Sequence, residues 1–163
     1  MAMDKCFDSR HALLDHAGIE ALVPHRGTMC LLDRLLAWSD LRIECAASNH
    51  RDAAHPLRTR SGLLATAAIE YAAQAAALHG ALLARQAGAD ASPGALASAR
   101  DVRLTRWRLD DLPDANPDAL RIVAERQAGD AGRLLYAFSV AHGGREIATG
   151  RLAVVLDMPR EMP

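Results

Sequence analysis

Apolar positions divide the chain into one long central stretch that is apolar nearly all round and several shorter stretches where apolar and polar residues alternate. The central stretch, residues 62–86, is rich in Ala and Leu, contains no proline and follows Ser61, a good N-cap residue. It predicts one helix of about 36 Å. A helix without a broad polar face is typical of one enclosed by other structure.

A membrane span is the competing interpretation of such an apolar helix. Glu70 and Gln74 fall in the middle of the stretch, where a bilayer would penalise a charged group by about 2.5–3.5 kcal/mol. Alanine also supplies little of the hydrophobicity that insertion requires. We therefore expect a helix buried in protein and no membrane span.

The flanking stretches predict a short N-terminal helix and mostly β-structure. Leu13, Leu14, Ala17 and Ala21 have near-helical spacing within residues 8–22, before Pro24. Strand patterns cover residues 28–38, 41–45, 96–107, 120–127, 133–141 and 145–156. Two strands, a buried helix and about four more strands predict an α+β fold in which an antiparallel sheet of about five to six strands covers the helix.

Length and charge restrict the remaining possibilities. A chain of 163 residues fits one domain, residues 1–163, with residues 1–22 as a helical extension. The formal net charge of -1 gives no general attraction for nucleic acid, so no nucleic-acid partner is expected. Three widely spaced cysteines fit neither a disulfide framework nor a zinc site, and the N-terminus lacks the apolar stretch of a signal peptide. We expect a cytoplasmic protein without a metal.

Polar residues inside the predicted helix are the first candidates for chemistry. Thr66, Glu70 and Gln74 recur every fourth residue, so they form one line that faces a cavity, a partner or, as a plainer alternative, solvent. A carboxyl group in apolar surroundings is hard to ionise, which would let Glu70 act as a general acid. The structural alternative is an ion pair between Glu70 and an arginine across a dimer interface. His79 lies on the opposite side of the helix and is excluded from this site.

A proton-transfer site also requires a base, and His55 lies in the polar loop before the helix. Histidine titrates near neutral pH, which suits proton abstraction. An exposed loop histidine is the alternative, with His50 only five residues earlier. Free amide groups at the start of the helix, near Gly62, could polarise a thioester carbonyl.

Two ordered strings resemble a known family. LVPHRGTMCLLDR and, further along, IEYAAQAAA resemble the hotdog-fold dehydratases that act on 3-hydroxyacyl chains of acyl carrier protein, most of all the branch of aryl-polyene and related pigment gene clusters. The matching positions are Pro24, His25, Arg26, Asp33, Arg34, His55, Ile69, Glu70, Tyr71, Ala73 and Gln74. The loop around His55 departs from the family's Gly-His-Phe-Pro, and the spacing from His55 to Glu70 is one residue longer.

The resemblance implies a hotdog fold and dehydration without metal or organic cofactor. In the family, His55 would be the base at C2 and Glu70 the acid that protonates the 3-hydroxyl, supplied by different subunits of a dimer. Gly62, Ala65, Thr66 and Gln74 would contact substrate, while His25 would belong to a structural turn. Partners would be acyl carrier protein and a second hotdog subunit, identical or different. Thioester hydrolysis and a non-catalytic acyl-binding subunit remain as alternatives.

Overall fold

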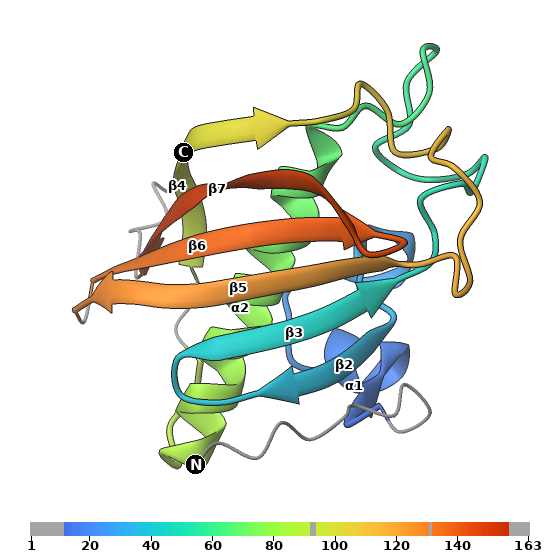
Figure 1. Cartoon of the computed structure of the whole chain (residues 1–163). Helices are drawn as coiled ribbons and strands as arrows, with labels where there is room; N and C mark the ends of the chain where they lie inside the picture. The colour runs from blue at the N-terminus through green and yellow to red at the C-terminus, as the bar shows by residue number, and fades with distance from the viewer. Residues whose placement is uncertain (1–11, 92–93, 131, 157–163) are drawn as a thin grey trace, which may run out of the picture.

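A computed structural model describes residues 12–91, 94–130 and 132–156. Its seven strands form one antiparallel sheet in the order β1-β2-β3-β5-β6-β7-β4, and one long helix lies against a face of that sheet (Figure 1). The elements are β1 (Leu14–Asp15), α1 (His16–Glu20), a 3₁₀ turn (Gly27–Met29), β2 (Arg34–Trp38), β3 (Arg42–Ala47), α2 (Ala67–Gln86), β4 (Gly94–Leu104), β5 (Leu120–Gly129), β6 (Arg133–His142) and β7 (Arg145–Leu156). The α+β architecture predicted from the sequence is confirmed, with the two-residue β1 bringing the strand count to seven.

The central helix α2 begins five residues later than its sequence predicts. Residues 63–65 instead pair with residues 107–109: the Leu109 amide donates to Leu63 O and the Ala65 amide to Trp107 O, both at 2.8 Å. These bonds hold the segment extended, so the helix starts at Ala67 and spans 20 residues, about 30 Å. The predicted start at residue 62 is therefore wrong.

Small side chains on α2 allow the sheet to approach the helix closely. Ala68, Ala72 and Ala75 are fully buried, and Ile43 and Ile122 are among the fully buried residues of the sheet. Close packing of this kind stabilises the helix through burial of apolar area. No helix among the described residues is long and apolar enough to cross a membrane.

Two shorter elements differ from their predicted ranges. The predicted strand over residues 28–38 is reduced to β2, because the side-chain amide of Gln74 takes the backbone bonds that a ladder would use: its Oε1 accepts from the Leu31 amide and its Nε2 donates to Met29 O, both at 2.8 Å. The N-terminal helix over residues 8–22 is reduced to α1, and residues 1–11 lie outside the described part.

Candidate active site

His55 lies in the wall of a pocket of 320 Å³ between the 3₁₀ turn and the loop that follows β3. Gly27, Thr28 and Asn49 also line this pocket. The imidazole is 5 % exposed. The loop histidine that the sequence singled out is therefore a pocket residue rather than a freely solvated one.

The hydrogen bonds around His55 define its tautomer. The Leu57 amide can only donate, and it donates to Nδ1 of His55 at 3.1 Å. Tyr71 donates its hydroxyl proton to Asn49 Oδ1 at 2.6 Å, so the 2.9 Å contact between Tyr71 and Nε2 of His55 requires the ring to donate. Neutral His55 thus carries its proton on Nε2.

Burial keeps His55 in this neutral form. Removal from water lowers the pKa of the imidazole below its ordinary value, and Arg58 acts in the same direction, while Asp52 opposes them. At neutral pH the ring is therefore able to accept a proton, which is the state that a general base requires.

Glu70 lies in the first turn of α2, but it does not line the pocket of His55. Its side chain is one-third exposed, and its Oε1 accepts from Gln74 Nε2 at 2.9 Å. The same oxygen lies 3.3 Å from Nε2 of His25. Within one chain, the two residues predicted to be catalytic therefore face different surroundings.

His25 reaches Glu70 because the turn before it is held by Arg26. The guanidinium of Arg26 donates to Glu20 O, at the end of α1, at 2.6 Å and to Val23 O in the segment that follows. Sequence reasoning assigned His25 to a structural turn, and the structure places it both in that turn and against the Glu70 carboxylate.

The amides near the predicted helix start are already engaged within the chain. The Gly62 amide donates to Thr59 O at 3.1 Å and the Ala65 amide to Trp107 O. Thr66 precedes the helix, and its hydroxyl makes no capping bond. A carbonyl-polarising site at Gly62 and Ala65 would require these bonds to open, because the helix does not begin there.

The remaining polar candidates of α2 make hydrogen bonds that hold the fold together, and a buried cysteine is unsuited to nucleophilic attack. Gln74 is buried and holds residues 29–31 against α2. His79 contacts the Tyr136 hydroxyl at 2.9 Å and Ser39 O at 2.7 Å, away from Glu70 as its spacing predicts. Burial raises the pKa of the Cys45 thiol to about 12, which disfavours the thiolate needed for nucleophilic attack.

Asn49, which lines this pocket, and Tyr71, which contacts His55, received no role from the sequence. Tyr71 orients the imidazole directly, and Asn49 accepts the tyrosine's proton and is itself fixed by donating to Leu31 O at 3.2 Å. The available signal was a tyrosine in the most buried part of an Ala-rich helix, where its hydroxyl needs a polar partner.

A family profile described as ApeP dehydratase matches residues 17–162. The chain belongs to the ApeP-like dehydratase family. This assignment agrees with the family resemblance seen in the sequence. No curated protein matches the sequence.

Solved structures similar to this ApeP-like chain share its fold. The dehydratase heterocomplex ApeI:P from Xenorhabdus doucetiae has a TM-score of 0.75 at 23 % identity, covering 88 % of this chain and 93 % of that one. A mutant thioesterase from Pseudomonas aeruginosa has a TM-score of 0.52 at 14 % identity, covering 76 % and 79 %. A hypothetical thioesterase with coenzyme A from Streptococcus pneumoniae has a TM-score of 0.51 at 11 % identity, covering 76 % and 84 %.

Proposed function

We propose that this ApeP-like chain dehydrates 3-hydroxyacyl thioesters of acyl carrier protein to trans-2-enoyl thioesters, in polyene or fatty-acid-like biosynthesis. The observation that carries the proposal is the neutral, buried imidazole of His55 in the wall of a pocket. Such a base removes the C2 proton, while an acid protonates the departing 3-hydroxyl group to give water.

The hydrogen bonds of His55 determine how the ring takes up a proton. The one lone pair of the neutral ring is on Nδ1, and the Leu57 amide occupies it at 3.1 Å. Proton transfer to Nδ1 requires this amide to move aside. The Nε2–H group can continue to donate to the hydroxyl oxygen of Tyr71, which stabilises the imidazolium that forms.

Glu70 is proposed as the acid of a composite site. Its carboxylate is one-third exposed and lies outside the pocket of His55, so it is available to a site that a second subunit completes. His25 and Gln74 orient one oxygen of this carboxylate. This arrangement supports one acid and one base contributed by different subunits.

The partner surface is proposed to include β4 and the segment after it. Among the described strands β4 pairs only with β7, which leaves an open sheet edge. Trp107 is 91 % exposed, and Leu64, Leu96 and Leu104 are exposed nearby or along the same strand. Exposed apolar side chains beside an open edge favour a protein partner. The similar structure from Xenorhabdus doucetiae is itself a heterocomplex, which supports a second hotdog subunit.

The test is an assay with 3-hydroxyacyl carrier-protein substrates, performed with the chain alone and mixed with the hotdog dehydratase subunit of its own genome. We expect the enoyl thioester, detected by intact mass as a loss of water. Release of free thiol would identify a thioesterase instead. Absence of either product in both preparations would overturn the proposed activity.

A further inference from the structure

Three side chains meet at one end of the sheet, outside the pocket of His55. His50 follows β3, Asp118 precedes β5 and His142 ends β6. The register pairs Ala47 with Leu120 and Leu120 with His142. The three residues therefore lie together where the neighbouring strands β3, β5 and β6 begin or end. The residues are far apart in the sequence, and no spacing motif announces them.

The geometry of this cluster resembles a ligand set. Nε2 of each imidazole lies close to the same oxygen, Oδ1 of Asp118, at 3.3 Å from His50 and 2.7 Å from His142. The three ligand atoms lie within 4.8 Å of one another. Tetrahedral zinc with bonds of about 2.0–2.1 Å separates its ligand atoms by about 3.3 Å. The 3.3 Å between Nε2 of His50 and Oδ1 already matches this separation, and the 2.7 Å between Nε2 of His142 and Oδ1 has to open by about 0.6 Å.

His50 supplies a second, independent observation. Its side chain is fully buried, and neither ring nitrogen makes a hydrogen bond among the described residues, because Nε2 is close to Asp118 but poorly aligned with it. Leaving such a group unpaired costs about 1–3 kcal/mol. A cation bound to Nε2 would satisfy this buried nitrogen.

Arg51 holds the carboxylate from the other side. Its Nε donates to Asp118 Oδ2 at 2.7 Å, and its Nη2 donates to Leu112 O at 2.9 Å. Nη2 also lies 3.3 Å from Oδ1, a weaker bond that a cation on Oδ1 would replace. Orientation of a ligating carboxylate by an outer hydrogen-bond donor is a common feature of metal sites.

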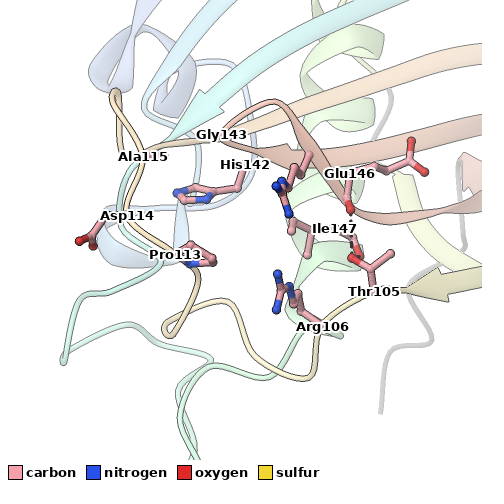
Figure 2. A pocket seen from close by; sticks show the side chains of 10 residues that line it. Thr105, Arg106, Pro113, Asp114, Ala115, His142, Gly143, Glu146 and Ile147 are labelled. Atoms are coloured by element: carbon pink, nitrogen blue, oxygen red, sulfur yellow. Dashed lines mark hydrogen bonds between the residues drawn. The ribbon is translucent and has the colours of Figure 1, made fainter.

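We propose that His50, Asp118 and His142 bind a zinc ion. Two imidazoles and one carboxylate suit zinc, whereas magnesium and calcium prefer oxygen ligands alone. His142 also lines a second pocket of 520 Å³, where Figure 2 shows its ring beside Pro113 and Ala115. The Asp118 side chain is 41 % exposed, which gives the ion a route from solvent to the cluster.

The experiment titrates chelator-stripped, tag-free full-length protein with Zn²⁺ in competition with a chromophoric chelator. We expect one equivalent to bind, with X-ray absorption showing nitrogen and oxygen ligands at about 2.0–2.1 Å and no sulfur at about 2.3 Å. Failure of wild-type protein to bind one equivalent, or sulfur in the coordination shell, would overturn the proposal.

Variants locate the site. Asp118→Asn and His142→Asn should each weaken Zn²⁺ binding by more than about 100-fold, since even outer-shell partners contribute about 10–100-fold. Asp114→Asn changes an exposed carboxylate in the same loop and should bind as wild type does. Unchanged affinity in both cluster variants would overturn the assignment. Because the wild-type spectrum identifies the ligand types independently, the proposal stays testable if a variant fails to fold.

Discussion

The hydroxyl of Tyr71 lies 2.9 Å from Nε2 of His55 and donates its own proton to Asn49. A second buried pair has the same separation: Tyr136 lies 2.9 Å from Nδ1 of His79, on the other side of the helix. Both pairs join a buried tyrosine to a buried histidine, but His55 donates to Tyr71, whereas His79 donates to Ser39 O and accepts from Tyr136. Of the two histidines, only His55 lines the 320 Å³ pocket. The two pairs allow a structural contribution of the tyrosine to be separated from a functional one.

Replacing either tyrosine should destabilise the fold, and only one replacement should alter turnover. Tyr71→Phe and Tyr136→Phe each leave one nitrogen of a buried imidazole without its hydrogen-bond partner, at a cost of about 1–3 kcal/mol. Urea unfolding measures this cost. In the dehydratase assay, Tyr71→Phe should lower kcat and shift the pH profile, whereas Tyr136→Phe should not. Equal kcat losses in the two variants would mean that Tyr71 acts through stability alone.

Gly62 is expected to be required for backbone reasons. Its φ is +97°, and an added Cβ would lie 2.6–2.7 Å from the paired side chains of Arg108 and Asp110. Gly62→Ala should therefore lower the free energy of unfolding by about 1–3 kcal/mol. Gly80→Ala is the matched control, since a Cβ there meets nothing within 4 Å and should stabilise α2 by about 0.5–1 kcal/mol. An unchanged free energy of unfolding in Gly62→Ala would contradict this explanation.

Stability should fall as the pH is lowered through the range of histidine titration. Burial lowers the pKa of both His55 and His79 below the ordinary value of 6.5. The unfolded chain therefore takes up protons near pH 6.5 that the folded chain does not, so the stability is complete above this pH and is lost below it. Each proton contributes a slope of about 1.4 kcal/mol per pH unit.

Urea unfolding at pH 7.5, 6.5 and 5.5, with chelator present, measures this slope. The Asp110 carboxyl does not contribute within the window, because its pairing with Arg108 lowers its pKa to about 2. A free energy of unfolding that stays constant or rises as the pH is lowered from 7.5 to 5.5 would contradict the neutral state assigned to the two histidines.

Trp107 should contribute to subunit association and little to folding. Its ring is 91 % exposed, so Trp107→Ser should change the free energy of unfolding by less than about 0.5 kcal/mol. If a partner covers it, association measured by analytical ultracentrifugation should weaken at least about 10-fold. Leu41→Ser, at an exposed apolar residue beside the β2–β3 turn, is the control that should leave association unchanged. If Trp107→Ser and Leu41→Ser had the same effect on association, the interface would lie elsewhere.

The fold was predictable because its signals are local. The strand-like pattern of residues 145–156 predicts β7 with its observed bounds, and the Ala-rich stretch predicts the existence and the end of α2. The start of α2 was not predictable, because long-range pairing of Leu63 and Ala65 with residues 107–109 overrides a good helix-forming sequence. The late start of β2, at Arg34 instead of residue 28, depends in the same way on the distant Gln74, which takes the Leu31 amide.

The site was predictable only in part. His55 could be selected by its place before the helix, but its tautomer depends on Leu57 and Tyr71. The contact between His25 and Glu70 joins a turn to a helix 45 residues away, and no periodicity in the chain encodes it. The family resemblance assigns a role to each matching residue. The hydrogen-bond partners of that residue are visible only in the folded chain.

The most direct measurement is the turnover of 3-hydroxyacyl carrier-protein substrate by the assembled dehydratase carrying His55→Asn or Glu70→Gln in this chain. Circular dichroism and partner affinity serve as controls for folding and assembly. If His55 is the base and Glu70 the acid, kcat should fall by about 10²–10⁴ in each variant while assembly is retained. Undiminished turnover by folded, assembled variants would contradict the account and would leave this chain as a supporting subunit.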